Sequence, residues 1–213
     1  MALRLSASSC LLVSVFAEGI FILRIRPIGL NSYSARTVVR RNQHLVNITK
    51  IGMERSRTIT WSDPHDAAGK ARHMSGMDYF KAISRGEIAY PPLLETLDLK
   101  AVSIEKGVAV FAFQPQEFHY NTIGTVHGGV ISAILDSAMG CAVHSLLEAG
   151  TGYTTLELKV NFLKAITVKA GLLKATSKTI HAGKRTALVE AQLTDEAGNI
   201  YAHGVSTCLI MVS

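Results

Sequence analysis

The sequence has few cysteines and no long uninterrupted apolar run. Its three cysteines, Cys10, Cys141 and Cys208, lie far apart and form no CxxC pair. This pattern argues against a disulfide scaffold and a cysteine-ligated zinc site, and it favours a reducing compartment. Glu18 interrupts the first apolar stretch, whereas a membrane helix needs about 20 consecutive apolar residues. We therefore expect a cytoplasmic protein without a membrane span.

Common catalytic signatures are also missing from the sequence. The patterns GxSxG, GxxxxGK[ST] and GxGxxG do not occur. The sequence therefore shows no signature of a serine-hydrolase elbow, a P-loop or a dinucleotide-binding turn. His119, His127 and His144 match no standard metal-ligand spacing. We therefore expect no metal site.

The basic charge is confined to one end of the chain. Residues 1–52 hold seven basic residues and one acidic residue, which accounts for the whole net charge of +6, and residues 53–213 hold 15 of each. The main part of the chain therefore lacks the electrostatic footprint of a nucleic-acid-binding domain. We expect residues 1–52 to be an extension that is disordered, a targeting segment or an upstream misassigned start, with the mature protein beginning at Met53.

The rest of the chain predicts a leader followed by one domain. Residues 53–76 are polar and predict a loose leader, and residues 77–213 form the domain. The expected elements are a helix at 78–85, strands at 100–105 and 108–114, a helix at 127–148, and strands at 155–162, 171–180, 186–194 and 201–211. The long helix is apolar nearly all round and must be buried on most faces. This order predicts an α+β fold in which a curved antiparallel sheet wraps around the long helix.

The strand after the long helix shows a period of two. Leu156, Leu158 and Val160 fall on one face, and Thr155 and Glu157 fall on the other. Such alternation is typical of a half-buried antiparallel strand. The pattern places Thr155 on the face opposite the apolar residues.

Two glycines open the long helix. Gly128 and Gly129 let another group approach backbone N–H groups that have no partner within the helix. Those donors and the helix dipole suit a carbonyl oxygen that gains negative charge. Asn121 offers a side-chain donor nearby. Plain packing is the alternative explanation of the glycines.

Asp136 is the only carboxylate in the apolar helix, and a carboxylate there is either paired or functional. It lies eight residues past Gly128, which is about 12 Å along a helix. One chain cannot easily place both groups on a single reacting carbon. Two such helices lying antiparallel across a two-fold axis would bring Asp136 of one chain to Gly128 of the other. The spacing therefore favours a homodimer with shared sites.

These residues together form a recognisable motif. The pattern N-x-x-G-x-x-H-G-G-x6-D is made by Asn121, Gly124, His127, Gly128, Gly129 and Asp136. It resembles the motif of the PaaI-type hotdog-fold acyl-CoA thioesterases, and residues 154–163 and 202–207 resemble later strands of that family. The resemblance covers about residues 77–212. It implies a hotdog fold, hydrolysis of acyl-CoA to a free acid and coenzyme A without a cofactor, and dimers paired into homotetramers.

The resemblance also implies a role for each motif residue. The Gly128 N–H would polarise the thioester carbonyl with help from Asn121, and Asp136 of the partner subunit would be general base or nucleophile. Thr155 would orient the water, and His127 would support the loop. The expected substrate-binding residues are Gly124, Gly129, Lys184 and Arg185, the last two meeting the phosphates of coenzyme A.

Three alternatives remain at this point. The same fold could serve a non-catalytic acyl-CoA-binding module, or a dehydratase or hydratase with a different acid–base pair. Residues 5–23 could anchor the chain to a membrane. The sequence leaves the acyl group open, and it suggests Ile134 and Met139 as candidates for the wall of the acyl tunnel.

Overall fold

The computed structural model describes residues 10–17, 20–27, 37–41, 44–48 and 55–212, the first four ranges as strand backbone. The chain divides into two compact units at about residue 58. The N-terminal unit contains a four-stranded antiparallel sheet in the order β1-β2-β3-β4. Its strands are β1 (Cys10–Ala17), β2 (Ile20–Pro27), β3 (Thr37–Arg41) and β4 (His44–Ile48). A mature start at Met53 stays a prediction.

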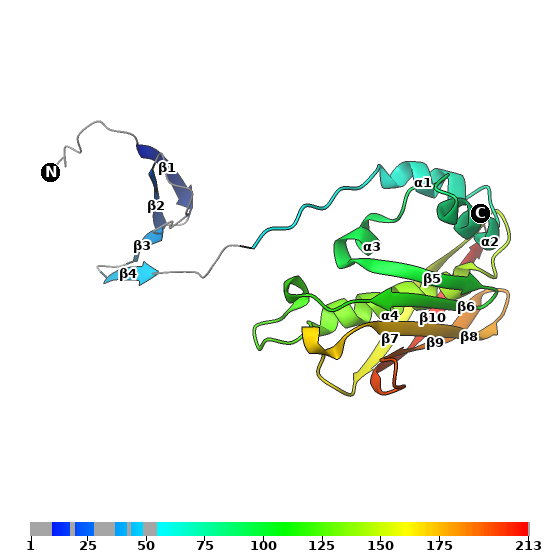
Figure 1. Cartoon of the computed structure of the whole chain (residues 1–213). Helices are drawn as coiled ribbons and strands as arrows, with labels where there is room; N and C mark the ends of the chain where they lie inside the picture. The colour runs from blue at the N-terminus through cyan, green and yellow to red at the C-terminus, as the bar shows by residue number, and fades with distance from the viewer. Residues whose placement is uncertain (1–9, 18–19, 28–36, 42–43, 49–54, 213) are drawn as a thin grey trace. The chain divides into compact units, whose positions relative to one another are not determined.

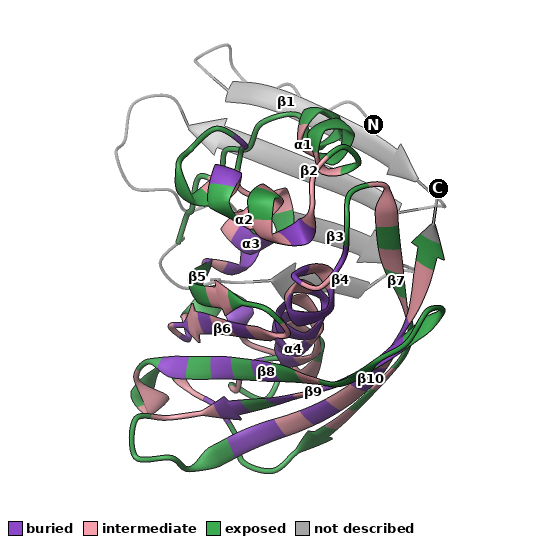
Figure 2. Cartoon of the chain, turned by 90° about the vertical axis from the view of Figure 1, so that its right-hand side faces the viewer, coloured by how far each residue is buried: buried purple, intermediate pink, exposed green. Residues whose placement is uncertain are grey.

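The second unit has one long helix inside a curved sheet (Figures 1 and 2). Its six strands are antiparallel in the order β5-β6-β8-β9-β10-β7. The strands are β5 (Leu99–Glu105), β6 (Val108–Phe113), β7 (Thr151–Phe162), β8 (Leu173–Ala182), β9 (Thr186–Thr194) and β10 (Ile200–Val212), and the long helix is α4 (Gly128–His144). This arrangement confirms the predicted α+β class and hotdog architecture.

The core lies between α4 and the concave face of the sheet. Leu135, Ala138 and Met139 of α4 are fully buried, as are the inward-facing residues of β6, β8 and β9. Gly204 on β10 faces the helix, where a Cβ would lie in van der Waals contact, at 3.4 Å, with side-chain atoms of Leu135 and Met139. Burial of these apolar faces is the main stabilising contribution of the domain.

Three short helices precede the sheet: α1 (Pro64–Ala71), α2 (Gly76–Ser84) and α3 (Pro92–Leu97). Helix α1 corrects the predicted loose leader. Asp63 caps it by accepting the His65 N–H at 2.9 Å, and Pro64 occupies its first turn, where a missing N–H costs nothing. No residue of α1 is buried, which is why its polar composition suggested a loop.

Helix α2 is held against the C-terminal end of α4. The Gly76 N–H donates to the Leu147 carbonyl at 2.9 Å, and a side chain at Gly76 would run into the backbone of His144. Only glycine allows this approach. Two 3₁₀ turns, η1 (Glu117–His119) and η2 (Val168–Ala170), complete the domain. Within the described residues, no helix is long and apolar enough to cross a membrane.

Candidate active site

The loop before α4 is built by the motif residues themselves. The Asn121 side chain accepts the backbone N–H groups of Ile123 and Thr125 at 3.0 and 3.2 Å, and it donates to the Thr125 hydroxyl at 3.1 Å. Gly124 adopts φ +78°, a left-handed conformation that favours glycine. Asn121 and Gly124 therefore shape the turn that leads into the helix.

His127 is the N-cap of α4. Its Nδ1 accepts the Gly129 N–H at 2.8 Å, and its backbone N–H donates to the His119 carbonyl at 2.8 Å. A Cβ at Gly129 would lie 2.9 Å from that Nδ1, so the cap requires glycine there. His127 thus fixes the start of the helix.

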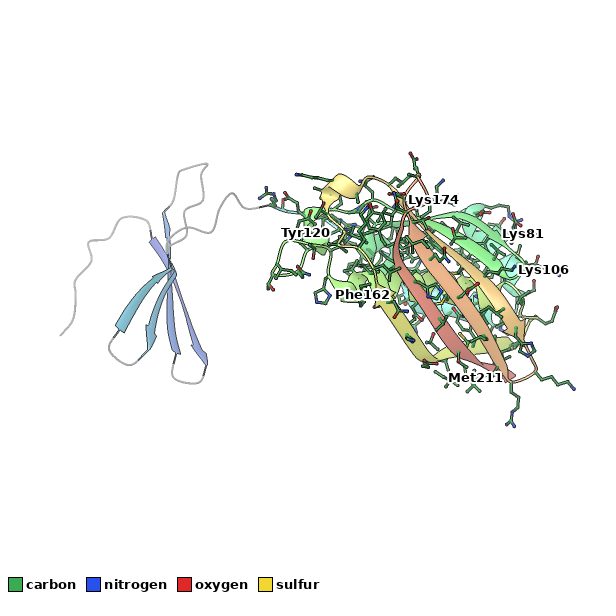
Figure 3. The ribbon with its side chains drawn as sticks, turned by 90° about the horizontal axis from the view of Figure 1, so that it is seen from below. Lys81, Lys106, Tyr120, Phe162, Lys174 and Met211 are labelled. Carbon is green, nitrogen blue, oxygen red and sulfur yellow. The ribbon has the colours of Figure 1, made fainter. Side chains whose placement is uncertain are left out.

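Gly128 presents the free donor at this end. Within residues 55–212 its N–H has no acceptor, as expected for the first residue of a helix. A Cβ at Gly128 would lie 3.2 Å from the ring of Phe162, so packing alone also explains this glycine. Figure 3 shows Phe162 and Tyr120 at the same end of the domain, and Met211 at the opposite end.

Asp136 lies two turns further along α4 and is partly buried. Its Oδ1 accepts the Thr155 hydroxyl of β7 at 2.9 Å. Among the described residues Oδ2 has no hydrogen-bond partner, and it is not sealed from solvent. One carboxylate oxygen is therefore oriented by the protein and the other is available to a ligand or water.

The position of Thr155 corrects the sequence-based prediction. Thr207 and Cys208 of β10 face Glu157 and Thr155, so Leu156 is the extra residue of a β-bulge. The bulge shifts the alternation, which turns Thr155 toward α4 and leaves Leu156 exposed. Without the bulge, the regular alternation of side chains along β7 would place Thr155 on the face opposite Val160, away from Asp136.

Not all predicted site residues meet within one chain. Gly128 packs on Phe162, whereas Asp136 bonds Thr155, seven residues away along β7. Lys184 and Arg185 lie exposed in the turn between β8 and β9. Next to this turn, Thr186 of β9 pairs with Leu209 of β10, and Leu209 pairs in turn with Thr154 of β7. Eight strand residues separate Thr154 from Phe162, or about 26 Å. Because Phe162 packs on Gly128, Lys184 and Arg185 are thus remote from Gly128 of the same chain.

The prediction that Ile134 and Met139 line the acyl tunnel is wrong. Ile134 and Met139 are fully buried in the core between α4 and the sheet. A cavity lies on another side of α4, against α2, α3 and β5, and Cys141, His144 and Tyr153 contribute to its wall. The apolar pattern of α4 alone gave no means of separating these two faces.

Burial changes the titration of the residues around that cavity. It raises the pKa of Cys141 to about 12, with the nearby Asp136 carboxylate contributing, and it raises the pKa of Tyr153. Burial lowers the pKa of His144. These groups are therefore neutral at pH 7. The described residues contain no group of three or more His, Cys, Asp or Glu side chains that could hold a metal ion.

Comparisons with known proteins identify related sequences and structures. A family model described as the thioesterase superfamily matches residues 123–202, which contain α4 and most of the later strands. The 1,4-dihydroxy-2-naphthoyl-CoA hydrolase of Listeria monocytogenes is 33% identical over 120 residues, covering 56% of this chain and 94% of that protein.

Solved structures show the same fold. The phenylacetic acid degradation-related protein of Ralstonia eutropha JMP134 is 27% identical with a TM-score of 0.57, covering 62% of this chain and 98% of that one. A protein of Streptococcus mutans UA159, solved with acetyl-CoA bound, is 25% identical with a TM-score of 0.50, covering 54% of this chain and 90% of that one.

Proposed function

This chain belongs to the hotdog-fold thioesterase superfamily and is a thioester hydrolase, and on that premise we propose that it hydrolyses acyl-CoA thioesters to a free acid and coenzyme A. The observation that carries the proposal is the Asp136 carboxylate. One of its oxygens is held by Thr155, and the other has no partner among the described residues. A carboxylate placed in this way serves as general base toward water, or as nucleophile toward the thioester carbon.

The oxyanion of the reaction needs donors that this end of α4 supplies. The Gly128 N–H is unused at the start of a helix, where the helix dipole also favours negative charge. One Asn121 amide hydrogen remains after its bond to Thr125, so Asn121 can add a second donor. His127 holds the loop, and Gly124 and Gly129 keep it free of side chains.

We propose that two chains share each site. Gly128 and Asp136 lie about 12 Å apart along one helix, which is too far for one thioester carbonyl. Strand β7 is an edge of the sheet, and its exposed Leu156 and Phe162 suit a second copy across a two-fold axis. A further pairing of dimers into a homotetramer follows the family resemblance.

Coenzyme A enters the proposal only as part of the substrate. Lys184 and Arg185 are exposed and make no ion pair within the described residues, so they are available to its phosphates. The reaction as proposed needs no cofactor. Cys141 and Cys208 are both free thiols, which supports a cytoplasmic location.

Thiol release from a panel of acyl-CoA esters tests the activity. Phenylacetyl-, hydroxybenzoyl-, hexanoyl- and palmitoyl-CoA would be offered to the full chain and to Asp136→Asn. The variant keeps the shape of the side chain and the Thr155 contact, and we expect it to lose about 10²–10⁴-fold in kcat. Equal rates in both proteins would contradict the role of Asp136. Binding without turnover by the wild-type chain would favour the non-catalytic acyl-CoA-binding module.

Mixed dimers test the shared site. Gly128→Pro removes the proposed donor, and proline is tolerated at the first position of a helix. Refolding it together with Asp136→Asn in equal amounts creates heterodimers in which one site has both wild-type residues. If sites are shared, activity returns to about a quarter of the wild-type value. Activity that stays at the level of the separate variants would place both residues of each site in one chain.

A further inference from the structure

His119 is a buried histidine for which the proposed reaction has no direct use. Only 2% of it is exposed, and its ring packs against those of Phe113 and Phe118, with ring centroids 4.9 and 4.1 Å away. A buried polar ring is costly unless its nitrogens are hydrogen-bonded. The partners of these nitrogens therefore indicate what the residue does.

Both ring nitrogens of His119 bond to the backbone. Its Nδ1 accepts the Gln116 N–H at 3.0 Å, and its Nε2 lies 3.0 Å from the Leu97 carbonyl oxygen. Because an N–H only donates and a carbonyl only accepts, the neutral imidazole with its proton on Nε2 fits both partners. Leu97 is the last residue of α3, where a carbonyl lacks a partner within the helix. The imidazole therefore ties the loop before α4 to the end of α3, 22 residues earlier.

The backbone of His119 connects this tie to the start of α4. Its carbonyl accepts the N–H of His127, the N-cap of the helix, at 2.8 Å. His127 in turn holds the Gly129 N–H at 2.8 Å, and the proposed oxyanion donor, the Gly128 N–H, lies between them in the chain. Hydrogen bonds therefore lead from the end of α3 to the two residues that flank that donor.

The loop at residues 119–127 is shaped by its own contacts, but its place in the domain depends on segments further away. One such contact is the Val126 N–H, which donates to the Ile166 carbonyl at 2.8 Å. Another is the bond from His119 to Leu97. Without that bond the loop can turn about its remaining contacts. A displacement of about 1 Å near a reacting group can cost about 10²-fold in rate.

We infer that His119 is a positioning residue that holds the Gly128 N–H of the proposed site in place. At 2% exposure its ring is closed to substrate, so it acts through His127 and not on the reacting atoms. The bond to Leu97 should matter more than the bond to Gln116, since only the first of the two reaches a distant segment. This inference rests on the proposed thioester hydrolysis, because it assigns the means by which the oxyanion donor of that reaction is held.

Three substitutions at His119 separate its two bonds. His119→Gln places an amide N–H near the position of Nε2, His119→Asn places an amide oxygen near that of Nδ1, and His119→Phe keeps neither. Each would be measured on the panel ester that the wild-type chain hydrolyses fastest. We expect His119→Phe and His119→Asn to lower kcat about tenfold or more with KM within about twofold, and His119→Gln to stay within about threefold. Wild-type kcat in folded His119→Phe, or an equal loss in His119→Gln, would overturn the inference.

Ser145→Ala is the matched control. Ser145 is also 2% exposed and also bridges two backbone groups, because its hydroxyl accepts the Gly107 N–H at 2.8 Å and donates to the Ala142 carbonyl at 2.7 Å. It follows the C-terminal end of α4, away from Gly128. We expect its loss to lower the urea midpoint of unfolding while kcat stays within about twofold. A loss of kcat equal to that of His119→Phe would show that any loss of stability lowers the rate, and would overturn the inference.

Phe118→Ala decides the matter if no variant of His119 folds. The Phe118 ring is half-exposed and packs on the His119 imidazole, so its removal takes away one support of the imidazole without opening a fully buried part of the core. We expect kcat to fall about threefold with KM within about twofold. Unchanged kcat in this variant would contradict the positioning role.

Hydrogen exchange of the backbone separates this inference from the proposed reaction, because it needs no turnover. We expect peptides that cover residues 121–130 to exchange about tenfold faster in His119→Phe and His119→Asn than in the wild-type chain, with little change in His119→Gln or Ser145→Ala. A chain that showed this pattern without hydrolysing any ester would contradict the proposed function alone. A chain that hydrolysed esters without the pattern would contradict the role of His119 alone.

Discussion

The two ends of α4 are built by different means. At the N-terminal end, short loop contacts made by Asn121, Gly124 and His127 place the backbone N–H of Gly128. At the C-terminal end, side chains from α2, β5 and β7 converge on His144 and enclose a cavity. The first end is assembled within nine residues of sequence, and the second needs segments more than 60 residues apart. Asp136 lies between them and is held by a third segment, β7.

In the proposed function the first end has a direct task. The backbone end suits the reacting carbonyl, which is the same in every thioester. The second end carries side chains from several elements, and its rings and polar atoms can be replaced without changing the backbone. We therefore expect substitutions at the first end to change kcat, and substitutions at the second end to change the free energy of unfolding.

Of the substitutions at the two ends, those at the backbone end are expected to have the largest effect. Gly128→Pro removes one N–H, and loss of one oxyanion donor costs about 10²–10³-fold in kcat. Gly128→Ala is the matched control, since it adds the same Cβ near Phe162 and keeps the N–H. The Phe162 ring is half-exposed and can move by the few tenths of an ångström required. Similar losses in both variants would mean that packing, and not the donor, requires glycine.

A smaller effect is expected for the group that orients the carboxylate. Thr155→Val keeps the shape of the side chain and removes the hydroxyl that donates to Asp136. We expect kcat to fall about tenfold with little change in KM, whereas Thr155→Ser should retain most activity. A tenfold loss in the serine variant as well would show that the methyl group, and not the hydrogen bond, is what matters.

A stability measurement probes the close packing of α4 on β7 at Gly140 and Tyr153. Gly140→Ala places a Cβ against the Tyr153 hydroxyl, which costs about 1–3 kcal/mol, partly offset by about 1 kcal/mol of helix propensity. We expect a net loss of about 1 kcal/mol in urea unfolding. Adding Tyr153→Phe should recover much of it. Gly69→Ala in α1 meets nothing within 4 Å and should not destabilise the chain.

The smallest effect concerns pH. Burial lowers the pKa of His144, so below about pH 6.5 the unfolded chain binds a proton that the folded chain resists. The free energy of unfolding should fall as the pH decreases through this range. Tyr79, Tyr153 and Cys141 remain neutral there because burial raises their pKa values. His144→Phe should flatten this part of the profile, and an unchanged slope would assign it to other groups.

Much of the fold was predictable from local pattern. The period of two predicted the strands, and the all-round apolar character of residues 128–144 predicted the buried helix. The motif from Asn121 to Asp136 predicted the family. The pattern failed at α1, whose cap at Asp63 could have been recognised but which buries no residue and so shows no apolar face. It also failed for Ile134 and Met139, which belong to the core and not to the cavity wall.

The sequence by itself determined where the long helix starts and that one carboxylate stands in its apolar length, whereas the predicted end at residue 148 lies four residues beyond the observed end at His144. These properties depend on neighbours a few positions apart, where capping, glycine conformation and periodicity act. Only the tertiary structure decided that Thr155 faces Asp136, because a bulge opposite β10 shifts the alternation of β7. It also placed His144 in the wall of a cavity with α2, since packing between distant segments, and not local pattern, determines which face of a buried helix borders a cavity.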